Sequence, residues 1–241
     1  DMGYATVQRT RNTDGKIIKE LYFDADGNPV KRYNEYYGIA YEYEDNMVKI
    51  TYLNADGVHP ITLTTGYSII VRTLNDAGKA VDEYYYDSKM QPASCNGYYG
   101  LYRGYNSDGQ NIQEVYLDRN GQIVYCASGY AIKMYDRDSS DLVAAEYYYD
   151  RQKKPTTSTL GQYGEKYQRN ENGQITQIIY LGVDGNPAPT QAGYTMLRRS
   201  YYRDGMAKTD MYFDGKGNPI ALSKGQYGIR RSGKINLLLD K

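Results

Sequence analysis

The chain repeats itself about every 32 residues, and this period constrains the fold more than any other feature. Each copy carries a tyrosine that is followed by an aromatic residue or Leu, called here the landmark tyrosine. The landmark tyrosines recur at a nearly constant spacing, at Tyr22, Tyr52, Tyr85, Tyr116, Tyr148, Tyr180 and Tyr212, with Leu238 in a shortened last copy. A fixed period of this length is typical of stacked supersecondary units, none of which buries its apolar face alone.

A second motif opens each copy, most often Gly-Tyr as in Gly66-Tyr67 and Gly129-Tyr130. Together the two motifs predict a single array over residues 1–241. Its copies lie near residues 3–34, 35–65, 66–96, 97–128, 129–160, 161–192 and 193–224, with a truncated copy at 225–241. Because the first residues already lie inside a copy, we expect the chain to be a fragment of a larger protein.

Odd and even copies differ in a regular way. The landmark tyrosine is followed by an aromatic residue in odd copies and by Leu in even copies, as at Tyr86 and Leu117. Even copies also open with Tyr-Gly, at Tyr37-Gly38, Tyr99-Gly100, Tyr163-Gly164 and Tyr227-Gly228. Strict alternation means that neighbouring copies meet different surroundings, so the predicted geometric repeat is two copies long.

Turn signals separate short runs of β-forming residues in every copy. Asn75-Asp76-Ala77-Gly78 and Asp24-Ala25-Asp26-Gly27 are examples. An Asp or Asn side chain caps its own turn and Gly takes the positive-φ position, which makes such segments strong hairpin signals. Proline, which lacks a backbone donor, often follows the second turn and should mark a strand start or an edge. It stands at Pro29, Pro60, Pro92, Pro155, Pro187 and Pro219.

These patterns predict an all-β fold, since no segment shows a sustained helical period with caps. We expect an elongated solenoid of stacked antiparallel β-hairpins with a repeat of about 32 residues, alternating in a super-repeat of about 64 residues. A four-bladed β-propeller is the alternative, because four units of four strands each would also fit the alternation.

The positions of the two cysteines distinguish a β-helix from a row of hairpins. Cys95 and Cys126 each lie ten residues after a landmark tyrosine, so they occupy the same position in adjacent copies. In a β-helix with one copy per rung these positions would lie about 4.8 Å apart, within reach of a disulfide. In a row of hairpins they lie at least two strand spacings apart. We therefore expect two free thiols.

Candidate binding residues come from the alternation of side chains along the strand. The residues on either side of the landmark tyrosine, such as Leu21 and Phe23, are apolar, and we assign their face to the core. The opposite face then carries the landmark tyrosine between two acids, as in Glu20-Tyr22-Asp24. The candidate ligand-binding residues are Tyr22, Tyr85, Tyr116, Tyr148 and Tyr212 with Glu20, Glu83, Glu114, Glu146 and Asp210.

A tyrosine ring between carboxylates could stack on a sugar or hold a cationic group. Equivalent sites would recur every second copy, with Tyr22, Tyr85, Tyr148 and Tyr212 as one set. The alternative is that these tyrosines pack between copies and the acids cap turns. Solvent exposure of the landmark tyrosines separates the two hypotheses.

Composition and motif counts argue against several other functions. Lys plus Arg equals Asp plus Glu at 29 each, which gives no reason to expect nucleic acid. No apolar run approaches the roughly 18 residues of a membrane span. One histidine, His59, and two cysteines cannot form a zinc site or a Ser-His-Asp triad. Carboxylate pairs recur with the repeat, whereas a catalytic site would interrupt it, so we predict no enzyme and no cofactor.

The repeat motif, Tyr-(aromatic or Leu)-Asp-x-x-Gly-x-Pro alternating with Gly-Tyr openings, resembles the tyrosine-rich repeats of bacterial surface and cell-wall-associated proteins. It is similar to tyrosine-aspartate repeats and to choline- or glucan-binding hairpin repeats, and the likeness covers residues 3–240. Choline- and glucan-binding repeats are shorter and use tryptophan, which this chain lacks. The resemblance therefore implies a location and a general role, and it does not name a ligand.

From this resemblance we expect a non-catalytic binding or spacer module of a bacterial surface protein, located outside the cell. Its expected partner is a cell-wall glycan or a teichoic-acid-like polymer, contacted through the repeated tyrosines. A purely structural or protein-interaction array is the competing hypothesis.

Overall fold

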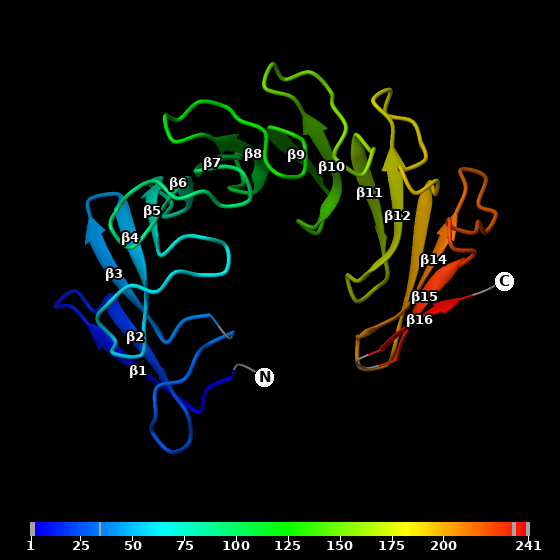
Figure 1. Ribbon diagram of the computed structural model, residues 1–241. Coiled ribbons are helices and arrows are strands. Elements are labelled where there is room, and N and C mark those ends of the chain that lie inside the picture. The colour runs from blue at the N-terminus through cyan, green and yellow to red at the C-terminus, as the bar shows by residue number, and fades with distance from the viewer. Residues whose placement is uncertain (1–2, 34, 233–234, 240–241) are drawn as a thin grey trace. The chain divides into compact units, whose positions relative to one another are not determined.

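The computed structural model describes residues 3–33, 35–232 and 235–239, and their side chains as far as residue 231 (Figure 1). The described residues form β-strands joined by turns and loops, and they contain no helix. The all-β prediction is confirmed. Leu238 and Leu239 lie in the last strand, but their side chains fall outside the described part.

The chain divides into two compact units, Asp1–Gly104 with Val115–Ala127 and Tyr105–Glu114 with Ser128–Lys241. Unit 1 contains β1 (Thr6–Arg11), β2 (Ile17–Phe23), β3 (Gly38–Glu44), β4 (Met47–Leu53), β5 (Ile69–Leu74), β6 (Ala80–Tyr86) and most of β7 (Gly100–Tyr105). The division falls within β8 (Asn111–Leu117). Unit 2 contains β9 (Ile132–Arg137), β10 (Val143–Tyr149), β11 (Gly164–Arg169), β12 (Ile175–Leu181), β13 (Met196–Tyr201), β14 (Ala207–Phe213), β15 (Gly228–Ser232) and β16 (Ile235–Leu239).

Within each unit the strands pair antiparallel in chain order, so every hairpin is bonded to the next. In unit 1 the pairing runs from β1 to β7, and in unit 2 from β9 to β16. Propeller blades of two copies would break the ladder after β4 and after β12. Instead Ile50 pairs with Ile70, and Ile178 pairs with Leu197. The stacked-hairpin prediction is therefore confirmed and the blade arrangement is not formed.

Long loops between hairpins form a second layer over one face of the sheet. After the second strand of a hairpin the chain turns back, and Val30 N donates to the carbonyl oxygen of the landmark Tyr22 at 3.0 Å. Ala93 makes the same bond to Tyr85 at 2.9 Å. Loops of neighbouring copies also bond to each other, as Thr159 N does to Ser128 O at 2.9 Å. The core of each unit lies between the sheet and its stack of loops.

The turn chemistry agrees with the sequence prediction. Oδ1 of Asp24 accepts hydrogen bonds from the backbone N–H groups of Asp26 and Asn28 at 3.0 and 2.8 Å, and Gly27 has a φ of 83°. The prolines form isolated antiparallel bridges with the residue after the landmark tyrosine, as Pro29 does with Phe23. Proline is tolerated at this position because it is part of an isolated bridge and not of a continuous ladder, so a backbone N–H is not needed.

The two thiols, Cys95 and Cys126, are free and buried, as predicted. The spacing of the strands alone does not describe how near the two copies lie at this point. On the loop side the backbones come close: Ala127 N donates to Asn96 O at 2.8 Å. In the loop layer, adjacent copies are therefore in direct contact. In the strand layer, each copy contributes a hairpin, so equivalent strands lie two strand spacings apart.

The alternation between odd and even copies has a steric cause. The glycine that opens β7, Gly100, lies directly opposite Tyr84, and a Cβ atom at Gly100 would lie 2.6 Å from two carbons of that ring. The same cross-strand pairing places Gly38 opposite Leu21, Gly164 opposite Tyr147 and Gly228 opposite Met211. Large side chains of odd copies lie over glycines of even copies, so the geometric repeat is two copies.

Candidate functional site

The landmark tyrosines are buried. The five candidates are between 1% and 7% exposed, at Tyr22, Tyr85, Tyr116, Tyr148 and Tyr212. The neighbouring residues Leu21 and Phe23, assigned to the core from the sequence, are only half-buried. In even copies the corresponding residues Leu53, Leu117 and Leu181 are buried, as assigned from the sequence. The prediction that the landmark tyrosines face solvent was therefore wrong. Its physical reason is the loop layer, which covers the tyrosine face and which strand periodicity alone does not reveal.

In unit 1 the landmark tyrosines alternate with tyrosines of the loops in one unbroken ladder. Ring centroids of successive members lie 4.8 to 6.0 Å apart. The members are Tyr4, Tyr22, Tyr36, Tyr52, Tyr67, Tyr85, Tyr98 and Tyr116. Tilted and edge-on aromatic pairs at this distance stabilise beyond simple area burial. The ladder packs each strand layer against its loops, and this is the packing role of the alternative hypothesis.

Unit 2 contains shorter runs of the same ladder. Tyr130 stacks on Tyr148 at 4.3 Å, and Tyr194 packs between Tyr180 and Tyr212 at 5.3 and 4.8 Å. Between the two runs, Gln162 takes the place that a loop tyrosine holds in most other copies.

The acids of the predicted stripe do lie beside the landmark tyrosines, as the sequence indicated, but inside the fold. Tyr22 Oη donates to Glu20 at 3.2 Å, and the guanidinium of Arg9, on the neighbouring strand, binds the same carboxylate at 2.7 Å. Two other odd copies repeat this pair at the same sequence spacing. Arg72 binds Glu83 and Arg199 binds Asp210, both at 2.6 Å.

A second arginine reaches two of these carboxylates from the following hairpin. Arg103 lies 3.4 Å from Glu83, and Arg231 lies 2.7 Å from Asp210. Burial acts to raise the pKa of Glu83, but the charge of Arg72 and the hydrogen bond from Tyr85 outweigh it and hold that pKa below its ordinary value. These acids are therefore ionised and neutralised internally, and both are buried.

Glu114 and Glu146 lie in unit 2 in a different environment. Oε1 of Glu146 accepts a 2.5 Å hydrogen bond from Tyr148, and its other oxygen lies 2.9 Å from Lys133 Nζ. Glu114 acts on Tyr135, whose pKa is raised first by burial and then by the Glu114 charge. The structure thus brings each of these acids to a tyrosine, again on the covered face.

The second acid of each predicted stripe, which follows the landmark tyrosine, caps a turn. Asp24, Asp87, Asp118, Asp150 and Asp214 each accept two backbone hydrogen bonds at Oδ1. The backbone N–H of Asn28, and then its side-chain amide, donate hydrogen bonds to Asp24 and hold the pKa of this carboxyl below its ordinary value. These acids belong to the turns.

The half-exposed aromatic residues lie on the opposite face, which sequence reasoning had assigned to the core. Leu21, Phe23 and Tyr37 line a groove of about 230 Å³ together with Pro29 and Gly57. We call this group and its equivalents the outer clusters, one for every two copies. By position their members are Leu21/Phe23/Tyr37, Tyr84/Tyr86/Tyr99, Tyr147/Tyr149/Tyr163 and Met211/Phe213/Tyr227.

The outer cluster of copies five and six is the best defined. The ring of Tyr163 lies 5.7 Å from that of Tyr147 and 5.6 Å from that of Tyr149, and the hydroxyls of Tyr163 and Tyr149 are 2.8 Å apart. In other clusters a cation covers one ring: Lys31 lies over Tyr37 and Arg119 over Tyr99. Aromatic rings that are half-exposed and carry a hydroxyl or a nearby cation can contact a polar polymer.

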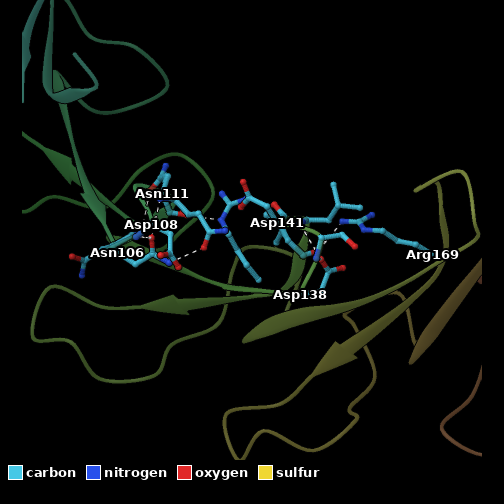
Figure 2. Close-up of polar contacts among 12 residues, drawn as sticks. Asn106, Asp108, Asn111, Asp138, Asp141 and Arg169 are labelled. Atoms are coloured by element: carbon cyan, nitrogen blue, oxygen red, sulfur yellow. Dashed lines mark hydrogen bonds and ion pairs between the residues drawn. The ribbon is translucent and has the colours of Figure 1, made fainter. Parts of the chain in front are cut away.

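Other polar groups hold hairpin tips together. Figure 2 shows the tips in unit 2, where Asn106 caps its turn by accepting from Asp108 N at 3.1 Å and Asp138 does the same for Ser140. An arginine side chain then reaches back to the preceding hairpin. Arg169 donates to Val143 O at 2.6 Å, and Arg137 makes the equivalent bond to Asn111 O (Figure 2). These contacts are structural clamps.

His59 is exposed and pairs with Asp56 at 2.7 Å within one turn. Across residues 3–33, 35–232 and 235–239, no three His, Cys, Asp or Glu side chains are grouped so that they could hold a metal ion. The same ranges contain no helix that is long and apolar enough to cross a membrane.

Comparison with known protein families and with curated proteins found no match.

Proposed function

We propose that this chain is a non-catalytic repeat module that acts as a spacer or protein-interaction array of a bacterial surface or cell-wall-linked protein. The observation that carries the proposal is the burial of the landmark tyrosines. The most regular residues of the sequence serve the packing of each unit, so the repeat is explained by architecture. The extracellular, cell-surface location rests on the resemblance of the repeat motif alone.

A spacer built from copies should tolerate the loss of a whole super-repeat. Deleting residues 129–192, which are copies five and six, joins an even copy to an odd copy and so preserves the alternation. The shortened chain should keep its β-sheet circular dichroism and a cooperative unfolding transition. Deleting copy five alone should be harmful, because it places two even copies side by side. Equal tolerance of both deletions would contradict the two-copy architecture.

Binding of a cell-wall glycan or a teichoic-acid-like polymer is the second candidate, and the outer clusters favour it. They recur every two copies, as a multivalent polymer site would require, and their members are half-buried except Tyr163, which is 7% exposed. Single sites would be weak, near the millimolar range or about 4 kcal/mol, and affinity for polymer would come from their number.

A pull-down on Gram-positive cell walls, with and without teichoic acid, tests this candidate. Phe23→Ala, Tyr86→Ala, Tyr149→Ala and Phe213→Ala should each weaken retention modestly, and together they should abolish it. Tyr43→Ala is the control, because Tyr43 is exposed and lies outside the outer clusters. If the wild-type chain binds neither wall preparation, the polymer-binding function is contradicted and the spacer function remains.

A further inference from the structure

One junction in unit 2 departs from the pattern of buried charges that the other odd copies share. In those copies the acid of the odd copy lies opposite an aliphatic residue that opens the next hairpin. The pairs are Glu20 with Ile39, Glu83 with Leu101 and Asp210 with Ile229. At copies five and six Glu146 lies opposite Glu165, so two carboxylates face each other across the β10–β11 ladder.

The cations of the pattern are also replaced at this junction. The residue opposite Glu146 on β9 is Tyr135, where the other odd copies place an arginine. Tyr167 stands two residues after Glu165, in the position of Arg103 and Arg231. Lys133 binds Glu146 at 2.9 Å. Within the part of the chain that the structure describes, no cation lies within ion-pair distance of Glu165.

Neutral hydrogen-bonding groups surround Glu165 instead. Tyr167 Oη donates to its Oε2 at 3.0 Å, and Gln162 Nε2 donates to its Oε1 at 3.1 Å. Gln162 is itself buried and takes the place of a loop tyrosine. Gln226 of copy eight also replaces the loop tyrosine, but there the strand position is the aliphatic Ile229. A Gln in the loop that directly contacts a Glu in the strand is seen between Gln162 and Glu165.

We propose that Glu165 is the proton-binding group of a pH-sensitive junction between copies five and six. The charged and titratable groups facing it are Glu146 and Tyr148 from β10, Lys133 from β9, Tyr180 from β12 and Tyr167 on its own strand, with Glu114 farther along the same face. Lys133 is the one lysine among these groups, and it binds Glu146. Protonation of Glu165 therefore removes both the cost of burying its charge and its repulsion with Glu146.

The direction of the effect follows from linkage. Burial, and then the charge of Glu146, raise the pKa of Glu165 above its ordinary value. A carboxyl whose folded pKa lies above its unfolded pKa stabilises the fold only while it is protonated. Its contribution is complete below the unfolded pKa of about 4.3 and is lost as the pH rises through the folded pKa. The junction should therefore loosen as the pH rises.

The test compares the full wild-type chain with Glu165→Gln by thermal unfolding between pH 4.5 and 8. At pH 7.5 the variant should melt roughly 2–4 °C above wild type, and the difference should vanish near pH 4.5. Glu171→Gln, at an exposed turn residue, is the control and should show no such pH-dependent difference. A difference that is unchanged between pH 4.5 and 8 overturns the proposal.

A direct titration keeps the proposal testable if Glu165→Gln does not fold. The side-chain carboxyl signal of Glu165 in the labelled wild-type chain should titrate clearly above pH 4.3, and a midpoint at or below that value would overturn the proposal. Calcium chloride at constant ionic strength gives a further check. A calcium-induced rise in melting temperature that Glu165→Gln abolishes would show a cation site in place of a proton site.

Discussion

The hydroxyl of Tyr85 donates a 2.5 Å hydrogen bond to Oε1 of Glu83, two residues earlier on the same strand. The other carboxylate oxygen binds Arg72 at 2.6 Å. Burial and the Glu83 charge raise the pKa of Tyr85, so the tyrosine stays a neutral donor to an ionised acid. A motif that suggested an exposed ligand site is thus a closed internal network.

Removing the Tyr85 hydroxyl should destabilise the protein, because Oε1 of Glu83 then keeps only its longer, 3.4 Å contact with Arg103. Tyr85→Phe should lower the free energy of unfolding by about 1.5–3 kcal/mol, as expected for a hydrogen bond to a charged group. Tyr102→Phe is the matched control, since Tyr102 is 40% exposed, and should change stability by at most about 0.5 kcal/mol. Equal effects in urea melts would contradict the internal network.

The alternation of copies can be tested at Gly100. A methyl group there would press on the ring of Tyr84, and Gly100→Ala should cost roughly 1–3 kcal/mol of stability by overpacking. Gly215→Ala should cost much less, because a Cβ at Gly215 meets no atom closer than 3.8 Å. In a Tyr84→Ala background the cost of Gly100→Ala should shrink. A cost that does not depend on Tyr84 would point to backbone strain and contradict the steric explanation.

The sequence predicted the repeat, the strands and the turns well because these depend on local chemistry. Asp24 and Gly27, for example, need nothing beyond their own turn. In odd copies the buried face was predicted wrongly because Leu21 and Phe23 are more apolar than Glu20 and Tyr22. Which face is buried depends on a loop layer from a distant part of the copy, which covers the tyrosines, and on an arginine that neutralises the acid.

One signal in the sequence could have corrected the prediction. An arginine precedes the acid in copy one, as Arg9 precedes Glu20, and the same spacing recurs in copies three and seven. A buried ion pair explains this spacing better than an exposed stripe. Gln162 and Gln226 both replace an opening tyrosine, but only the structure shows that Gln162 contacts Glu165, which stands in an aliphatic position.

Tyrosine ionisation provides a test by pH. Burial is the main cause that raises the pKa of Tyr41 and of Tyr147 to about 12. A neutral group with a raised folded pKa stabilises the fold below its unfolded pKa of about 10, and the contribution is lost as the pH rises above that value. Absorbance at about 295 nm should therefore show a cooperative tyrosinate step that coincides with loss of the β-sheet signal. Smooth ionisation of all tyrosines near pH 10 with an intact sheet signal would contradict this.

The most direct measurement is the residue-resolved reactivity of tyrosines toward tetranitromethane, read by mass spectrometry and normalised to the unfolded chain. If the landmark tyrosines build the interior, Tyr22, Tyr85, Tyr148 and Tyr212 should be protected in the folded protein, while Tyr33 and Tyr102 should react. Nitration of the landmark tyrosines at the rate of Tyr102, with the sheet still folded, would place them at the surface and contradict the packing role.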